Sequence, residues 1–438
     1  MAALQGSADL PGRSVRYEVA AAMLAETLEG VRFSPSKRAT YVRLVLAALT
    51  AIVAFKTFWF ARWGGWTDRK LADFDAFHIV AQRIWRGDLD QVYHFEALLK
   101  MQMEAAGGAT GFMPWTYPPQ YDLLLAPFAL LPVGLAYLLF TAATLALYLA
   151  VLRKIADVNF APVLVILFPA LAITIGAGQN GFLTGALIAL VCLNVERRPL
   201  LAGLALGAMV IKPHLAIAVG VYLLATRRWV ALATAAAVVL ASSLLCTLLF
   251  GWQIWTAWLG AIRESASYLE QGSYPLYRMV SAYAALYEAG LPANIAFWGQ
   301  VTVAGLALLA VLIGTARGTS SRFALGIAVM VSVMISPYAY DYDLPMLGIG
   351  LALILPDLTG LTGPRERSWM YGLILLAGAY GLLQSARLQV DQTADPSRHF
   401  TPAIGGFALM ALLLFLLGLL WRRTQPAPAS PQAAQHHV

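Results

Sequence analysis

Residues 73–94 read DFDAFHIVAQRIWRGDLDQVYH, and this polar stretch directly follows the first long apolar run of the chain. Its apolar residues recur at helical spacing, which predicts an amphipathic helix lying on a membrane surface with its aromatic side down. The stripe is formed by Phe77, Val80, Ala81, Ile84 and Trp85. Two carboxylates, Asp73 and Asp75, stand at the start of this helix. They are candidates for chemistry at the interface, although a helix N-terminus also favours acidic residues as simple caps.

The composition is that of a membrane protein. Of 438 residues, 60% are hydrophobic and 12% are charged, and the mean hydropathy is +0.68, whereas soluble domains carry about 25% charged residues. The net charge of +7 falls in small groups between apolar runs, so we expect membrane lipids and no nucleic acid as partners. Cys192 and Cys246 lie within apolar segments and are interpreted as core residues.

The apolar runs predict an all-α polytopic fold with about twelve membrane crossings. We expect a membrane domain over 39–423, between a cytoplasmic segment 1–38 and a disordered cytoplasmic tail 424–438. The first outer loop, 61–133, would hold the surface helix. It would also hold a broken or re-entrant helix in the proline-rich run YPPQYDLLLAPFALLP at 117–132, which is too short to cross a bilayer. A second large outer loop is expected at 252–292.

The distribution of basic residues predicts the orientation. With both termini in the cytoplasm, 18 of the 30 Lys and Arg residues fall on the inner side, in line with the positive-inside rule. All unusual polar motifs then lie outside: DFDAFH at 73–78, YPPQYD at 117–122, GAGQNG at 176–181, KPH at 212–214 and SPYAYDYD at 336–343. A scaffold would not segregate its motifs in this way. We therefore expect an inner-membrane protein with a site on its periplasmic face.

Three basic side chains are candidates for holding a phosphate. Lys212 and His214 flank Pro213 between two apolar segments, where charged groups are costly and usually functional. Snorkelling of Lys212 to the interface is the alternative. Arg278, in SYPLYR of the second outer loop, is a candidate for a charge-assisted phosphate contact.

Amides, tyrosines and further carboxylates are candidates for binding a sugar or an acceptor. Gln179 and Asn180 lie in a glycine-rich turn, where their amides would suit sugar hydroxyls, although a plain helical hairpin explains the glycines nearly as well. Tyrosines at a membrane border could form an interfacial belt, but here two carboxylates are interleaved with them. These residues are Tyr338, Tyr340, Asp341 and Asp343.

The absence of certain sequence motifs limits the possible classes of sugar donor. No P-loop, Rossmann glycine pattern or nucleophile elbow stands where a soluble domain could use it. A donor linked to a lipid phosphate fits an outer site better than a nucleotide does. Its tail would lie in the bilayer and its phosphate would meet Lys, Arg or His.

The ordered set of motifs resembles bacterial glycosyltransferase family 87. The resemblance covers about residues 60–345 and rests on D-F-x-x-F at 73–77, the following Ala81, Gly87 and Tyr93, YPP at 117–119, GQNG at 178–181, KPH at 212–214 and SP…YD at 336–343. It implies a GT-C fold, a periplasmic active site and a polyprenyl-phosphate sugar donor. Characterised members are inverting mannosyltransferases that use an aspartate of the first outer loop as base. Two departures from the family pattern, at Phe77–His78 and at Tyr342–Asp343, leave the sugar and acceptor open.

These observations together predict a hexosyltransferase that moves mannose or a related sugar from a polyprenyl phosphate to a lipid or glycan acceptor. Asp73 matches the family's base by its spacing to Phe77. Phosphate contacts fall to Lys212, His214 and Arg278, and sugar or acceptor contacts to Asp75, His78, Tyr117, Gln179, Asn180, Tyr338, Tyr340, Asp341 and Asp343. No cofactor is expected. A metal between Asp73 and Asp75 is conceivable but not favoured, because cationic side chains can serve the phosphate.

A multispanning transporter of a lipid-linked or polar solute is the alternative, since about twelve spans is also a common transporter count. Transporters place coupling carboxylates near the middle of the membrane, and almost no acid falls within a predicted span of this chain.

Overall fold

The computed structural model describes residues 24–29, 34–63, 71–108, 111–390 and 401–422. Most of the predicted segment 1–38 and the predicted tail 424–438 lie outside these residues. All regular elements of the described part are helices, and the one strand-like feature there is an isolated antiparallel bridge between Met279 and Tyr340. The all-α fold expected from the apolar runs is therefore confirmed.

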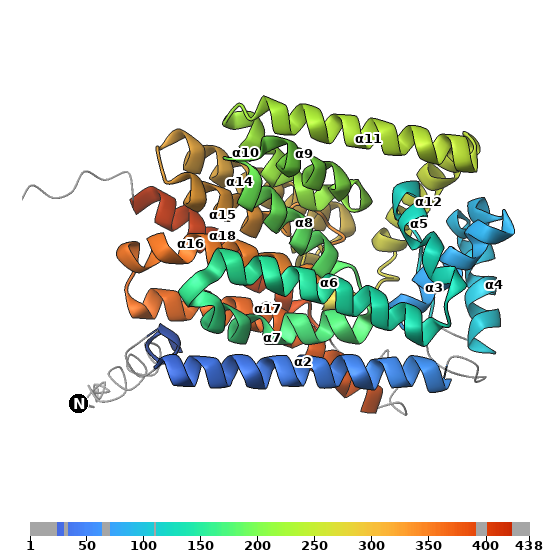
Figure 1. Cartoon of the computed structure of the whole chain (residues 1–438), viewed down its shortest axis with the longest axis horizontal. Helices are drawn as coiled ribbons and strands as arrows, with labels where there is room; N and C mark the ends of the chain where they lie inside the picture. Colours follow the sequence, from blue (N-terminus) through green and yellow to red (C-terminus); the bar gives the residue numbers. More distant parts are fainter. Residues whose placement is uncertain (1–23, 30–33, 64–70, 109–110, 391–400, 423–438) are drawn as a thin grey trace, which may run out of the picture.

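The helices follow one another as an up-and-down bundle interrupted by two groups of short helices (Figure 1). The elements are α2 (Pro35–Trp63), α3 (Asp73–Arg86), η1 (Leu89–Tyr93), α4 (Phe95–Ala106), α5 (Pro119–Leu125), η2 (Ala126–Leu130), α6 (Val133–Ala156), η3 (Asp157–Asn159), α7 (Phe160–Ala177), α8 (Gly181–Asn194), α9 (Pro199–Ala208), η4 (Met209–Ile211), η5 (Pro213–Ala216), α10 (Ile217–Ala225), α11 (Trp229–Phe250), α12 (Gln253–Glu270), η6 (Leu276–Arg278), α13 (Ala282–Glu288), α14 (Ala293–Ala316), α15 (Ser321–Ser332), η7 (Asp341–Asp343), α16 (Pro345–Leu361), α17 (Pro364–Val390) and α18 (Ile404–Arg422).

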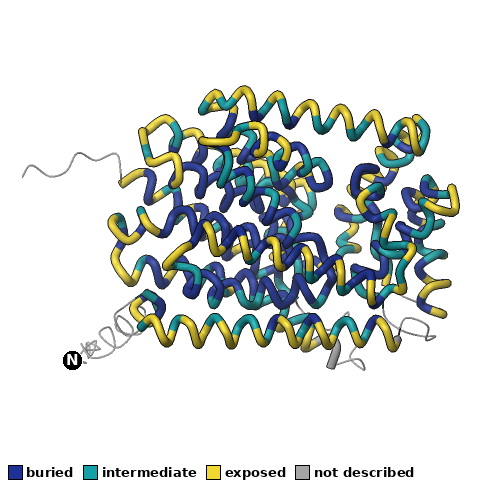
Figure 2. The backbone as a smooth tube through the Cα atoms, viewed as in Figure 1, coloured by how far each residue is buried: buried dark blue, intermediate teal, exposed yellow. Residues whose placement is uncertain are grey.

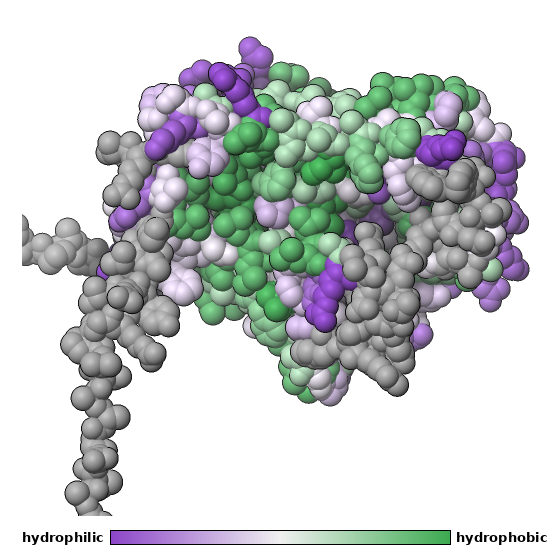
Figure 3. Space-filling model, turned by 90° about the horizontal axis from the view of Figure 1, so that it is seen from below, coloured by the Kyte–Doolittle hydropathy of each residue, from purple (hydrophilic) through white to green (hydrophobic). Residues whose placement is uncertain are grey.

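Six helical stretches of the described residues are long and apolar enough to cross a membrane: Pro35–Arg62, Val133–Ala177, Trp229–Phe250, Ala293–Ala316, Pro364–Arg387 and Ile404–Arg422. The Val133–Ala177 stretch contains both α6 and α7. Shorter apolar helices, among them α8, α15 and α16, fill the interior of the bundle (Figure 2). The chain is thus a multispanning membrane protein, and its α2 side presents a broad apolar surface between more polar ends (Figure 3).

The helices α3, α4, α5 and α12 gather at one end of the bundle, which we call the site end (Figure 1, right). The predicted amphipathic helix is confirmed as α3, but its apolar face packs on protein rather than on a membrane surface. Phe74, Phe77 and Val80 are fully buried in an aromatic cluster with residues of α5 and α6. Trp85, expected to face the membrane with the others, stays 62% exposed. The helix thus joins the site end to the bundle.

The two segments predicted as outer loops are largely helical. The proline-rich run forms two short pieces, α5 and η2, as the predicted broken helix requires, with Pro119 in the first turn of α5 and Pro127 in η2. Residues 252–292, expected as a loop, hold the 18-residue helix α12 together with η6 and α13. The basic turns lie away from these elements. Arg322 donates hydrogen bonds to the carbonyl oxygens of Ile155 and Ala352, so α6, α15 and α16 meet at the opposite end.

Helix α11 attaches to the bundle through close backbone contact with α9. Two glycines four residues apart, Gly203 and Gly207, face α11. A Cβ atom at Gly203 would lie 2.4 Å from Cβ of Thr234, and one at Gly207 would lie 2.5 Å from Cβ of Val238. Such paired small residues let membrane helices approach closely. The remaining faces of α11 are largely exposed (Figure 2).

Candidate active site

The glycine-rich turn between α7 and α8 organises the site. Gly178 ends α7 in the left-handed conformation, with φ of 70°, and its amide caps the helix by bonding to Thr174 and Ile175. Gly181 begins α8 so close to η7 that a Cβ atom there would lie 1.8 Å from the carbonyl oxygen of Tyr342. The glycines therefore do more than close a hairpin. They let this turn fit between the start of α3 and η7.

Asp73, the predicted base, lies at the first position of α3 and faces this turn. Nε2 of Gln179 donates a hydrogen bond of 3.1 Å to Oδ2 of Asp73. Oε1 of the same Gln179 accepts a bond of 3.1 Å from the Tyr117 hydroxyl. Gln179 is 7% exposed, whereas Asp73 is half-buried. The carboxylate is thus fixed by one amide and remains accessible.

Two further polar residues of α3, Asp75 and His78, bond to backbone groups. Asp75, a predicted sugar or acceptor contact, is buried, with 2% of its surface exposed. Its Oδ2 accepts the Ala72 N–H at 2.8 Å, and so it holds the first turn of its own helix, as the capping alternative proposed. The ring Nε2 of His78 contacts the carbonyl oxygen of Leu131 at 2.9 Å, which joins α3 to the end of η2.

Lys212 forms a buried ion pair with Asp343. Its Nζ lies 2.5 Å from Oδ1 of Asp343, with the two side chains 8% and 0% exposed. The ammonium also lies 4.8 Å from the ring centroid of Tyr342, within cation–π range. Oδ2 of Asp343 accepts the Tyr340 N–H, which caps η7. Lys212 does not snorkel to the surface, so that alternative is wrong.

Arg278 forms a second pair with Asp341. Its Nε and Nη2 donate bonds of 3.2 and 3.1 Å to the two oxygens of one carboxylate, the paired geometry typical of arginine. The bridge between Met279 and Tyr340 brings the two segments together. On α17, a Cβ atom at Gly381 would lie 2.2 Å from Oδ2 of Asp341, so glycine leaves room for the acid. Burial lowers the pKa of Arg278, but the charges of Asp341 and Asp73 outweigh it and the net shift is upward, which keeps the guanidinium charged.

The charged groups nearly balance. Lys212 and Arg278 face the carboxylates of Asp73, Asp341 and Asp343, which leaves one negative charge in excess. An ammonium has three N–H donors and a guanidinium has five. The pair with Asp343 uses one donor of Lys212, and the pair with Asp341 uses two of Arg278. Both cations can therefore still donate to an anionic ligand.

Several buried polar atoms at this end have no partner with good hydrogen-bond geometry among the described residues. They are both amide atoms of Asn180, the hydroxyl of Tyr121, Oε1 of Gln120 and Nε2 of His214. Buried polar groups without partners are uncommon and costly, and a ligand with hydroxyls would satisfy them. Asn180 was predicted as a sugar contact. Tyr121 and Gln120 were not, because YPPQYD was interpreted mainly through its prolines.

The three tyrosines of 338–342 have different surroundings. Tyr340 and Tyr342 stack with centroids 5.1 Å apart and planes 9° apart, beside both cations. Tyr338 contacts the ring of Tyr274 in the cluster around α13, against which Tyr340 also packs. The ring beside the two cations is therefore that of Tyr342, which was not among the predicted site residues, although it lies between two that were.

The structure thus joins Asp73, Tyr117, Gln179, Lys212, Arg278, Asp341 and Asp343 in one connected set of contacts at the site end. The described residues hold no group of three or more His, Cys, Asp or Glu side chains spaced for a metal ion. Oδ2 of Asp73 accepts a bond from Gln179, and Oδ2 of Asp75 accepts the Ala72 N–H.

The model of glycosyltransferase family 87 matches residues 115–337, slightly more than half of the chain. The chain belongs to glycosyltransferase family 87. The matched range contains Tyr117, Gln179, Lys212 and Arg278, whereas Asp73 lies before it. No curated protein and no solved structure matches this family 87 member. Family membership makes the chain a membrane glycosyltransferase, which argues against the transporter and scaffold alternatives.

Proposed function

We propose that this glycosyltransferase transfers a hexose, mannose by family resemblance, from a polyprenyl phosphate to a lipid or glycan acceptor at the periplasmic face of a bacterial inner membrane. Both termini would be cytoplasmic. The observation that carries the proposal is the linked set of Asp73, Gln179, Lys212 and Arg278, because it places a carboxylate and two cations around one site.

In the proposed reaction Asp73 acts as general base. Its carboxylate takes the proton of the acceptor hydroxyl while the hydroxyl oxygen bonds to the anomeric carbon from the face opposite the phosphate. The bond between that carbon and the phosphate oxygen breaks, and its electron pair leaves with the lipid phosphate. The configuration at the anomeric carbon is therefore inverted. Gln179, bonded to Oδ2 of Asp73, would keep the carboxylate in position.

Lys212 and Arg278 would stabilise the leaving phosphate. The gain is largest where water is excluded, and both side chains are mostly buried. Their remaining N–H donors can bind phosphate without breaking the pairs with Asp343 and Asp341. His214 would be a further contact, because its buried Nε2 lacks a partner among the described residues. The amide of Asn180 and the hydroxyl of Tyr121 would meet the sugar.

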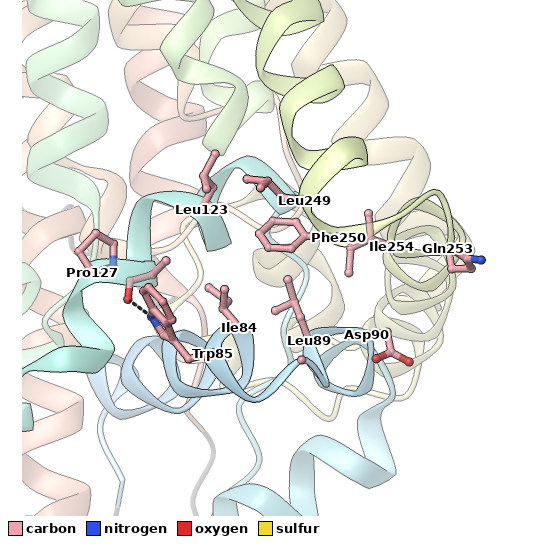
Figure 4. A pocket seen from close by; sticks show the side chains of 12 residues that line it. Ile84, Trp85, Leu89, Asp90, Leu123, Pro127, Leu249, Phe250, Gln253 and Ile254 are labelled. Atoms are coloured by element: carbon pink, nitrogen blue, oxygen red, sulfur yellow. Dashed lines mark hydrogen bonds between the residues drawn. The ribbon is translucent and has the colours of Figure 1, made fainter.

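A nearby apolar pocket suits the isoprenoid tail of the donor. It has a volume of about 560 Å³ and lies where α3, α5, α11 and α12 meet (Figure 4). Ile84, Leu123, Leu249 and Phe250 point into it, and Asp90 and Gln253 lie at its edge. Helix α5 separates this pocket from the Lys212 turn and packs against both η4 and α11. A lipid whose phosphate meets Lys212 would thus find an apolar wall next to a membrane-spanning helix.

The experiment is transfer by the purified protein in nanodiscs. Polyprenyl-phosphate mannose, polyprenyl-phosphate glucose and a nucleotide sugar would each be offered as donor with a lipid extract as acceptor. Transfer from a polyprenyl-phosphate sugar, with inverted configuration in the product, would support the proposal. Transfer from the nucleotide sugar alone would overturn it.

A further inference from the structure

A further buried carboxylate lies outside the set of contacts described so far. Asp122 of α5 is 0% exposed. The indole N–H of Trp115 donates to its Oδ1 at 3.0 Å, and the Tyr93 hydroxyl lies 2.6 Å from its Oδ2. The other titratable side chains that sense its charge are Tyr121 of α5 and Cys246 of α11. No lysine, arginine or histidine of the described residues acts on it.

The Tyr93 hydroxyl has two oxygen neighbours but one proton. Besides Oδ2 of Asp122, it lies 3.0 Å from the carbonyl oxygen of Tyr117. If Asp122 is ionised, both neighbours are acceptors, and the single proton of Tyr93 can satisfy only one of them well. If Asp122 carries a proton on Oδ2, it donates to Tyr93, and Tyr93 donates to Tyr117. The neutral acid therefore satisfies every contact in the chain.

This chain of bonds ends at the candidate active site. Tyr117, whose carbonyl oxygen faces Tyr93, places its own hydroxyl against Gln179, and Gln179 holds Asp73. The rings of Trp115 and Tyr117 also pack together, with centroids 4.9 Å apart. Asp122 thus holds Tyr117 through two routes, one by way of Tyr93 and one by way of Trp115.

We propose that Asp122 is a positioning residue, held as a neutral carboxylic acid, that fixes Tyr117 and through it the Gln179–Asp73 pair. The role of that pair rests on the function proposed above. The protonation of Asp122 does not, because it follows from the geometry of Tyr93 and Trp115 alone.

Burial agrees with this geometry. It raises the pKa of Asp122 to about 7, against the hydrogen bonds from Tyr93 and Trp115, which lower it. A carboxyl whose pKa in the folded protein lies above its unfolded value stabilises the fold fully at low pH, and this contribution is lost as pH rises through about 7. Because the positioning role needs the neutral acid, the rate of transfer should also decline as pH rises through about 7.

The test compares Asp122→Asn with Asp122→Leu. Asparagine can donate an N–H to Tyr93 and accept from Trp115, as the neutral acid does, whereas leucine can do neither. We expect Asp122→Asn to keep kcat within about threefold of wild type at about pH 6 and to lose the decline above pH 7. We expect Asp122→Leu to lower kcat by about 10- to 100-fold, with a smaller change in donor KM. If Asp122→Leu does not fold, Tyr93→Phe serves as the second variant. It keeps the ring but removes the hydroxyl, and it should also lower kcat.

Infrared spectroscopy tests the protonation without any substrate. The wild type should show a protonated carboxyl band at about pH 6 that disappears in Asp122→Asn and at about pH 8. A wild type that shows this band but no transfer would contradict the proposed function and leave the protonation of Asp122 intact. Absence of the band, or an Asp122→Asn variant as inactive as Asp122→Leu, would overturn the neutral-acid role.

Discussion

Replacing Asp73 by asparagine isolates the proton-accepting role of its carboxylate. Within the described residues, Gln179 donates a 3.1 Å bond to Oδ2 of that carboxylate, and the Oδ1 of an asparagine can accept the same bond. Asp73 is half-buried at a helix start, so the change adds no volume and opens no cavity. The variant should fold and bind donor normally.

The size of the effect separates catalysis from positioning. Weakening a charge-assisted hydrogen bond to a neutral one costs about 1 kcal/mol, or about fivefold in rate. Removing a general base costs about 10²- to 10⁴-fold in turnover, or about 2.7 to 5.4 kcal/mol. We therefore expect Asp73→Asn to lose at least 100-fold in kcat, measured as sugar transfer from a defined polyprenyl-phosphate donor, with donor binding measured separately on the same sample.

Asp75→Asn is the matched control, since it changes the same group two residues away. Its amide oxygen can still accept the Ala72 N–H, so the loss in turnover should stay below about tenfold. Turnover retained by Asp73→Asn would refute the role of Asp73 and make Asp341 the next carboxylate to test. Equal losses in both variants, with added divalent metal restoring chelator-treated wild type, would indicate a metal instead.

Three further outcomes are expected. Lys212→Met should weaken donor use by about 10- to 150-fold, but it also leaves Asp343 as an uncompensated buried charge, so its stability should fall by about 3–5 kcal/mol. The double variant Lys212→Met/Asp343→Asn should recover the stability and not the donor use, and recovery of both would assign the phosphate elsewhere. A cysteine at Gly107 should react with an impermeant thiol reagent in intact spheroplasts and one at Arg228 should not, whereas the reverse pattern would place the site in the cytoplasm. Leu249→Trp should fill the apolar pocket and raise KM for a long-chain donor more than for a short-chain analogue, and equal effects on both would remove the tail from that pocket.

The fold could be predicted from the sequence because its signals are local. A run of apolar residues or a stripe at helical spacing identifies a membrane helix or α3 without knowledge of any partner. The helix α12 within 253–270 was not predicted, because that segment was interpreted through its position between spans. Asp75 could not be assigned to the cap rather than to water without knowing that the helix begins just after Ala72.

The candidate residues of the site were found as separate motifs, but their pairing was not. Lys212 and Asp343 are 131 residues apart, and Arg278 and Asp341 are 63 apart. Which cation meets which acid depends on how η6 and η7 pack against α17, and no spacing in the sequence encodes that. Asp122 was not predicted because it looks like one polar residue in a broken apolar helix. Its meaning depends on Tyr93 and Trp115, which come from other turns of the chain.

The close contact between α9 and α11 has a mechanical consequence for the lipid pocket. Lipid tails solvate an apolar helix about as well as protein side chains do, so the hydrophobic effect gives α11 little reason to stay on the bundle. Its position depends on the fit of Thr234 and Val238 against Gly203 and Gly207. The far end of the same helix supplies Leu249 and Phe250 to the pocket. The position of one pocket wall is therefore set by the contact between α9 and α11. A methyl group added to Gly203 or Gly207 would shift α11 and change the width of the pocket, although neither glycine lines the pocket.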